Sequence, residues 1–182
     1  NLLFDIYRVG DIRADIKQVE PILRNADMLT FDVSAIRQPD APGNVNASPN
    51  GFYGEEACQL CWYAGLSDRI TSFGLYEVNP DLDFNGQTSH LVSQMIWYFI
   101  EGFYHRRNEF PYENEKGFVK YKVQLEDFDE DMLFFKSKHS DRWWMQVVAP
   151  QNIQMKYERH YIVPCSYDDY QKATSNELPD KW

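Results

Sequence analysis

The stretch Met28–Gly51, MLTFDVSAIRQPDAPGNVNASPNG, decides the fold of this 182-residue chain. It has the pattern of a short apolar strand followed by a long loop of Pro, Asn, Ser and Gly. The strand brings Asp32 and Ser34 to its carboxyl end, and we expect both on one face because side chains alternate along a strand. Open α/β sheets bind their ligands at such strand–loop junctions. The sequence therefore predicts a ligand site here.

Composition limits the classes of function. The chain has 28 acidic and 18 basic residues, a net charge of −10 that repels a phosphate backbone, so we expect no nucleic-acid partner. The longest apolar run, Met95–Ile100, falls far short of the roughly 20 residues that span a bilayer, so no membrane partner is expected. Three cysteines cannot all pair internally, which favours a reducing, cytoplasmic location. The start at Asn1 indicates a fragment or a processed product.

Hydrophobic periodicity around the opening stretch predicts alternating strands and helices. We expect strands at 2–9, 28–35 and 70–78, and helices at 11–24, 54–64 and 88–106. Strands joined through a helix by short links run parallel, so the third strand brings Glu77 to the same sheet edge as Asp32. The predicted fold class is α/β, a three-layer arrangement with a mainly parallel sheet flanked by helices, over residues 1–112.

The predicted helix at 88–106 is apolar on nearly all sides. Such a helix is usually buried, either in a core or against another chain. We therefore expect the protein to form a homo-oligomer.

The pattern of apolar and polar residues changes after Pro111. Residues 118–126 alternate between apolar and polar side chains, as in a half-exposed antiparallel strand, and further strands are expected at 132–135 and 143–148. A polar, Tyr-rich tail follows from 157 to 182. Residues 113–182 are therefore interpreted as a β-rich extension of the first domain.

Cysteine and histidine give weak signals. Cys58 and Cys61 form a C-x-x-C within an apolar helical pattern, without a second such pair or a nearby His, so buried thiols are favoured over a redox or zinc role. The four histidines are scattered and none lies beside a carboxylate pair, so none is assigned to catalysis.

Three segments together resemble a known family. They are TFDVSAI at 30–36, DAPGNVNASPNG at 40–51 and LYEVNPDLDFNGQT at 75–88. In the ureohydrolase family of arginases, agmatinases and formimidoylglutamases, S-F-D-x-D is followed by D-P and A-P-G-x-x-x-P-x-x-G-G, and a later strand ends in E-V-N-P. The resemblance covers roughly residues 1–107, the last part of the family's domain, and the end of the third segment is closest to formimidoylglutamases.

The resemblance implies an arginase-like α/β domain with two Mn²⁺ ions at the strand ends, which activate water for attack on a guanidino or formimino carbon. It implies that Asp32 is a metal ligand that bridges the two ions. Glu77 corresponds to the residue that pairs with the cationic nitrogens of the substrate, and Asn46 to a loop residue that helps hold that group. A carboxylate suits the metal-binding role of Asp32, because hard divalent cations prefer anionic oxygen. It also suits the substrate-binding role of Glu77, because a guanidinium prefers a paired acceptor. No catalytic residue is assigned within this chain.

The departures from the family pattern concern the metal site. Ser34 replaces the second metal carboxylate, and Arg37 and Gln38 replace the D-P. A serine hydroxyl is a weak, neutral ligand, and the other family ligands would lie before Asn1. We therefore hypothesise that Arg37 takes the place of the cation and pairs with Asp32, leaving no metal; the alternative is that Arg37 points to solvent.

Two functions follow. In the first, the complete protein hydrolyses a C–N bond of a small guanidino or formimino amino acid, and this chain, inactive alone, supplies the substrate-binding half. In the second, the chain is a non-catalytic, metal-free relative that serves as a binding or assembly module.

Overall fold

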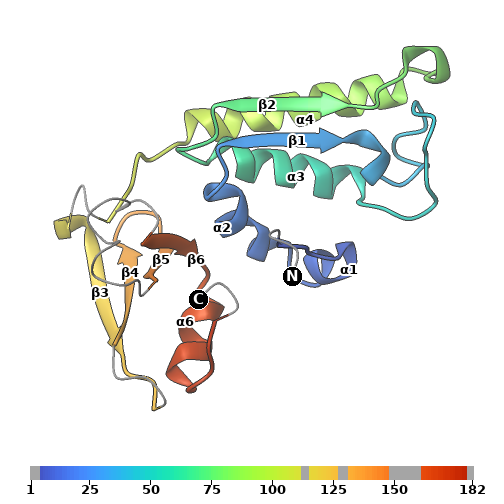
Figure 1. The fold of residues 1–182 in the computed structure, drawn as a ribbon. Helices are drawn as coiled ribbons and strands as arrows, with labels where there is room; N and C mark the ends of the chain where they lie inside the picture. The colour runs from blue at the N-terminus through green and yellow to red at the C-terminus, as the bar shows by residue number, and fades with distance from the viewer. Residues whose placement is uncertain (1–4, 112–114, 127–130, 148–160, 180–182) are drawn as a thin grey trace. The chain divides into compact units, whose positions relative to one another are not determined.

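The structure is a computed structural model that describes residues 5–111, 115–126, 131–147 and 161–179. The chain divides into two compact units, Asn1–Arg106 and Arg107–Trp182 (Figure 1). The boundary expected between residues 112 and 113 falls in the segment 112–114, outside the described residues.

The first unit contains a parallel pair of strands. β1 (Met28–Asp32) and β2 (Ser72–Tyr76) pair in a register that runs from Met28 opposite Ser72 to Asp32 opposite Tyr76 (Figure 1). α3 (Gly54–Gly65) connects them, and α4 (Gln87–Tyr104) follows β2. The predicted α/β class and the parallel sheet are confirmed. The strands are shorter than expected because a 3₁₀ turn at Val33–Ala35 ends the first, and the second stops before Glu77.

One face of the β1–β2 pair carries the core of this unit. Phe31 of β1 and Phe73 and Leu75 of β2 alternate onto the face that packs against α3 and α4. The rings of Phe73 and Phe99 stack with their centroids 4.5 Å apart, which joins β2 to α4. Within this core lie Ala57, Leu60 and Cys61 of α3 and Met95 of α4.

α3 and α4 approach each other so closely that only glycine fits at the contact. A Cβ on Gly65 would overlap the carbonyl oxygen of Phe99, and a Cβ on Gly102 would overlap that of Trp62. Just beyond the contact, Arg106 donates from Nε to the carbonyl of Gly65 and from Nη2 to that of Ile70, both at 2.8 Å. The end of α4 is therefore fastened to the end of α3.

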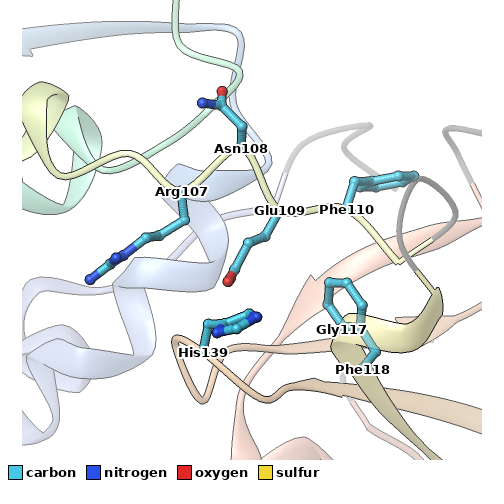
Figure 2. Close-up of a pocket in the computed structure, with 7 residues that line it drawn as sticks. All are labelled: Arg107, Asn108, Glu109, Phe110, Gly117, Phe118 and His139. Atoms are coloured by element: carbon cyan, nitrogen blue, oxygen red, sulfur yellow. The ribbon is translucent and has the colours of Figure 1, made fainter.

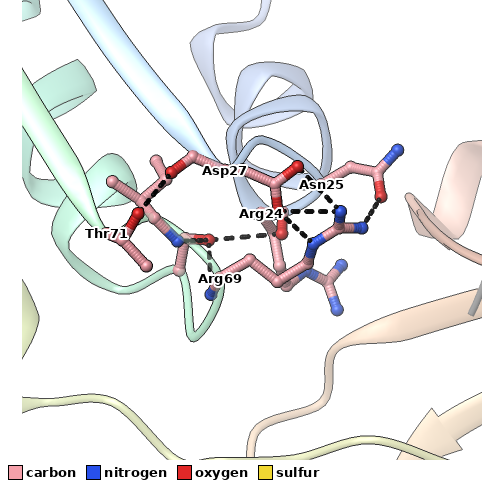
Figure 3. A network of polar contacts seen from close by, with 7 residues as sticks. Arg24, Asn25, Asp27, Arg69 and Thr71 are labelled. Atoms are coloured by element: carbon pink, nitrogen blue, oxygen red, sulfur yellow. Dashed lines mark hydrogen bonds and ion pairs between the residues drawn. The ribbon is translucent and has the colours of Figure 1, made fainter.

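An arginine links the segments that immediately precede β1 and β2 (Figure 3). Arg69 lies just before β2 and forms a bidentate ion pair with Asp27, which precedes β1, with Nη2–O distances of 2.9 and 3.1 Å. Its Nη1 also donates to Asn25 Oδ1 at 2.8 Å. The backbone N–H and the hydroxyl of Thr71 both donate to the carbonyl of Asp27. These bonds set the register at which the parallel pair starts.

The N-terminal expectations were partly wrong. Residues 1–4 lie outside the described residues, Asp5–Arg8 form no strand, and a helix begins at Val9. The single helix expected at 11–24 is instead α1 (Val9–Ala14), a short 3₁₀ helix and α2 (Val19–Arg24). The break lies at Asp15, whose extended backbone lets its carboxylate accept the N–H of Lys17. Aspartate favours such a local turn over an internal helical position.

The second unit contains an antiparallel sheet in the order β3–β4–β5–β6. Its strands are β3 (Phe118–Val123), β4 (Met132–Ser137), β5 (Trp143–Gln146) and β6 (Ile162–Cys165). The strand at 162–165 and α6 (Tyr167–Thr174) were missed, since this region was interpreted as a polar tail. The start of α6 could have been recognised from Ser166 and Asp169, which form a capping box. The hydroxyl of Ser166 accepts the N–H of Asp169, and the carboxylate of Asp169 accepts the N–H of Ser166.

Replacing Gly102 with alanine tests the close contact between α3 and α4. We expect Gly102→Ala to destabilise the first unit by about 2 kcal/mol or more, because backbone atoms on the facing helix cannot move aside. Urea-dependent hydrogen exchange of α4 amides measures this unit by itself. Gly10→Ala is the control, since Gly10 lies in α1 with open space around it. Equal effects of the two substitutions would contradict the packing argument.

Candidate functional site

The carboxyl ends of β1 and β2 bring two acidic residues to one edge. Asp32 pairs in register with Tyr76, so Glu77, the next residue, follows at the same end of the sheet. Both residues are exposed. The parallel register thus produces the acidic edge that the sequence predicted.

The carboxylate of Asp32 makes a local turn. Its Oδ1 accepts the backbone N–H of Ser34 at 2.8 Å, which starts the 3₁₀ turn Val33–Ala35. Asp32 and Ser34 were expected to share a strand face, and this was wrong because the strand ends at Asp32. Ser34 lies in the turn and is partly buried. One lone pair of the Asp32 carboxylate is consequently already engaged.

Arg37 has a different partner from the one hypothesised. Its Nε donates to Asp40 Oδ2 at 2.8 Å, and its guanidinium lies over the ring of Tyr53, 3.8 Å from the centroid. The hypothesised pair with Asp32 is therefore replaced by one within the loop. The nearness of Asp40 in sequence could have indicated this, because a three-residue separation suits a turn.

Asp40 links the loop to the start of α3. Besides Arg37, its Oδ2 accepts the N–H of Gly54, the first residue of α3, at 2.9 Å. The hydrogen bond from Arg37 lowers the pKa of the Asp40 carboxyl, and the N–H of Gly54 lowers it further. A negative charge at a helix N-terminus is also favourable to the helix dipole. The loop is thus fastened at one side by an ionised carboxylate.

The other side of the loop is fastened to the N-terminal part of α4. The N–H of Gly43 donates to Thr88 Oγ1 at 2.7 Å, and the N–H of Asn79 donates to the carbonyl of Gly43 at 2.8 Å. Asp83 in turn accepts the N–H groups of Thr88 and Ser89 at the start of α4.

Sequence reasoning missed this chain of bonds through Thr88 and Asp83. The available signal was the carboxylate of Asp83 a few residues before the predicted helix, since an acidic group can accept the free N–H groups of a helix start. Asn46 lies on the loop held in this way and is exposed. The loop between residues 37 and 51, expected to lack regular structure, is thus anchored on both sides.

Glu77 has an unusual backbone. Its φ of 62° places it in the left-handed region, which side chains other than those of Gly, Asn and Asp rarely adopt. Such strain costs on the order of 1 kcal/mol and gathers at ligand sites. No sequence pattern predicts a left-handed backbone at a glutamate.

The cysteines are inert. Cys58 and Cys61 are free, buried thiols, as predicted. Burial raises the pKa of both, so they stay protonated at neutral pH.

The edge does not fit a two-metal site by itself. Among the residues that the structure describes, no three His, Cys, Asp or Glu side chains gather closely enough to hold a metal ion. Asp32 is the single carboxylate of its turn, and Ser34 beside it offers only a neutral hydroxyl. Hard dications need several anionic oxygens. No step of chemistry is therefore derived through a metal in this chain.

Two hollows accompany these features. One of about 360 Å³ lies between the N-terminal parts of α3 and α4 and is lined partly by Asp40, Glu55 and His90. The second unit has one of about 270 Å³ (Figure 2). There Glu109 accepts the hydroxyls of Ser137 and Ser140, which fixes the turn that carries His139. The carboxylate of Glu109 in the second hollow is thus used to hold a turn of its own unit.

Comparison with known proteins places this geometry in a family. The model of the Arginase family matches residues 3–101, more than half of the chain. The chain belongs to the arginase family. The matched region contains the whole acidic edge, from Asp32 to Glu77, and ends inside α4. No described helix of this family member could span a membrane.

The relatives are formimidoylglutamases of bacteria. That of Bacillus subtilis strain 168 is 25% identical over 101 residues, which are 54% of this chain and 32% of the relative. That of Staphylococcus haemolyticus is 28% identical over 85 residues, 46% of this chain and 27% of the relative. This arginase-family chain thus spans about a third of the length of the curated relatives it matches.

Solved structures show the same fold. The formimidoylglutamase of Bacillus subtilis matches with a TM-score of 0.51 and 24% identity over 56% of this chain and 35% of that one. A Trypanosoma cruzi formiminoglutamase with Mn²⁺ matches with a TM-score of 0.50 and 22% identity over 54% and 34%. The expected arginase-like architecture is confirmed for this part of the chain.

The pH dependence of stability tests the role of Asp40. A carboxyl whose pKa is lowered in the folded protein stabilises it above the ordinary pKa, and this stabilisation disappears as the pH falls through the lowered value. We expect Asp40→Asn to reduce the free energy of unfolding at neutral pH, with a difference from wild type that shrinks below about pH 4. Urea unfolding at several pH values measures it, with Glu101→Gln on the exposed side of α4 as control. A difference that does not vary with pH would refute the ionic role.

Proposed function

We propose that this chain is the part of an arginase-family hydrolase that binds the cationic nitrogen group of its substrate, a small guanidino or formimino amino acid. The whole protein then cleaves a C–N bond of that group. The observation that carries the proposal is the parallel register, which puts Glu77 directly beyond the residue opposite Asp32. Guanidinium and formimino groups present several N–H donors, which carboxylates accept best.

Glu77 is the proposed partner of the substrate nitrogens. It is exposed at the strand end, and no ion pair or hydrogen bond within the described residues occupies its carboxylate. Its left-handed backbone supports this role, since strained positions at a strand end persist where the side chain must take an unusual direction.

Asn46 is proposed to hold the same group from the loop. Its amide offers one acceptor and two donors, and the loop is fixed at Asp40 and at Gly43. Beyond Asn46, the carbonyl of Ser48 accepts the N–H of Gln38, so the loop is anchored on either side of Asn46 and keeps such a contact in place. Asp32 is proposed to remain the one metal-site carboxylate of this chain, and the resemblance implies Mn²⁺ ligands from the rest of the family's domain.

A metal-free binding or assembly module is the second candidate. It is favoured by the neutral Ser34 hydroxyl, which stands where the resemblance implies a second metal carboxylate. In this candidate the acidic edge binds a cationic group without hydrolysing it. Cytoplasmic location and homo-oligomer formation remain part of the proposal for either function.

Activity distinguishes the two candidates. The protein to assay is this chain together with the remaining two thirds of an arginase-family domain, supplied with Mn²⁺ and offered arginine, agmatine or formiminoglutamate. We expect release of urea, ammonia or formamide from one of these, and a loss of about 10- to 100-fold in kcat/KM in Glu77→Gln, because a charged hydrogen bond is removed. Glu55→Gln, at the start of α3, is the matched control. No turnover of any of the three substrates would favour the binding module.

Manganese binding tests the incomplete metal site directly. We expect the chain alone to bind Mn²⁺ too weakly for a stoichiometric complex, and Ser34→Asp to strengthen binding measurably, because a second carboxylate then stands beside Asp32. Electron paramagnetic resonance of free Mn²⁺ during titration gives the affinity. Ser34→Asn is the control of similar size without charge. Stoichiometric Mn²⁺ on the unaltered chain, abolished by Asp32→Asn, would contradict this expectation.

A further inference from the structure

Two arginines from different parts of the first unit contact one tyrosine. The guanidinium carbon of Arg13, in α1, lies 4.3 Å from the centroid of the Tyr53 ring. That of Arg37, at the start of the loop at residues 37–51, lies 3.8 Å from the same centroid. A guanidinium is attracted to the face of an aromatic ring. Tyr53, which directly precedes α3 and is partly buried, is therefore the point at which α1 and the loop meet.

Each of these arginines also has a carboxylate of its own. Arg13 Nε donates to Glu56 Oε1 at 3.0 Å, and Arg37 Nε donates to Asp40 Oδ2 at 2.8 Å. The other oxygen of Glu56 accepts the backbone N–H of Tyr53 at 2.8 Å. Because each guanidinium is paired with a carboxylate, the repulsion between the two cations is largely cancelled. The aromatic ring is then the link between the two ion pairs.

α1 depends on contacts of this kind for its place in the unit. It has six residues, none of them buried. A helix this short is not stable in water by itself, so its structure requires contacts with the rest of the unit. Ile12 packs against the core, and Arg13 supplies the ion pair and the ring contact. α1 can thus exist in a docked and an undocked arrangement, and Arg13 favours the docked one.

We propose that Tyr53 is a positioning residue that couples the docking of α1 to the order of the loop at residues 37–51. When α1 is docked, Arg13 fixes the ring, the ring supports Arg37, and Arg37 holds Asp40. When α1 is undocked, Arg37 loses its fixed support. Asp40 keeps its bond to the N–H of Gly54, so the loop becomes looser and is not released. The docked and undocked arrangements of α1 are the two states that such a coupling needs.

The coupling has a consequence for the ligand of Asn46, and that consequence alone rests on the proposed function. A looser loop loses more conformational entropy when it binds, so the docking of α1 favours binding. By linkage, a bound ligand favours the docked α1 to the same extent. The coupling itself rests on the contacts at Tyr53 and can be tested without a ligand.

Hydrogen exchange of the full chain measures the order of the loop. The reporter is the amide of Gln38, which donates to the carbonyl of Ser48 across the loop. We expect Tyr53→Leu to speed its exchange about two- to fivefold, as for the loss of an exposed cation–π contact. Tyr53→Phe keeps the ring and is expected to exchange like the unaltered chain. Arg13→Gln is expected to act like Tyr53→Leu, whereas Arg8→Gln, at the exposed start of the same helix, is the matched control.

The titration of Asp40, followed by nuclear magnetic resonance, separates coupling from general destabilisation. The hydrogen bond from Arg37 lowers the pKa of the Asp40 carboxyl. We expect Tyr53→Leu and Arg13→Gln to raise that pKa toward its ordinary value, because Arg37 then makes the bond less often. Tyr53→Phe and Arg8→Gln are expected to leave it unchanged. A change that only lowers the stability of the unit does not alter this titration in the folded protein.

The double variant shows whether the ring transmits the effect. In the Tyr53→Leu background, Arg13→Gln is expected to cause no further change in the exchange of Gln38 or the titration of Asp40, because the link is already broken. An equal effect of Arg13→Gln in both backgrounds would overturn the role of Tyr53.

The proposal as a whole would be overturned if Arg13→Gln changed neither reporter. If Tyr53→Leu does not fold, the comparison of Arg13→Gln with Arg8→Gln decides the matter, since both positions are exposed. A chain that shows the coupling and binds no guanidino or formimino compound would count against the proposed function and leave this inference standing.

Discussion

The contact between α3 and α4 at Gly65 and Gly102 is the constraint on which the first unit depends. α3 follows β1 and α4 follows β2 of a parallel pair, so the two helices run in the same direction, and both N-termini contact the loop. One N-terminus holds the loop through Asp40, and the other holds it through Thr88. The contact at Gly65 and Gly102 lies toward the C-terminal ends of the two helices, so the helices connect it to the loop beside the acidic edge.

The acidic residues near the sheet edge have different roles: some hold the loop and the start of α4 in place, and others leave their carboxylates exposed to a ligand. Asp40 and Asp83 are fully engaged in fastening the loop and the start of α4, and their hydrogen bonds keep them ionised. Glu77 is left to solvent. Asp32 is intermediate, because one oxygen shapes the turn. Similar side chains thus differ in role through the number of N–H groups that face them.

Sequence predicted the features that depend on period and order. The parallel pair, α3 and α4 followed from apolar spacing, and the acidic edge followed from strand order. The partner of Arg37 was predicted wrongly, although the three-residue separation from Asp40 was a local signal for the pair that forms. The end of β1 comes from a local turn in which Asp32 accepts the N–H of Ser34, and the alternating pattern of side chains does not reveal such a turn. The left-handed backbone of Glu77 has no sequence signal either. At residues 162–174, a short strand followed by a helix with many polar residues had too little apolar periodicity to be recognised.

Arg106 gives the first unit a mechanical property. It is the last residue of that unit, and its guanidinium binds the carbonyls of Gly65 and Ile70, which belong to a different part of the chain. A pull on the chain beyond Arg106 would load these two hydrogen bonds before it reached the last turn of α4. Tension from the second unit would thus be transmitted to the end of α3, and α4 would be protected from unwinding at its C-terminus.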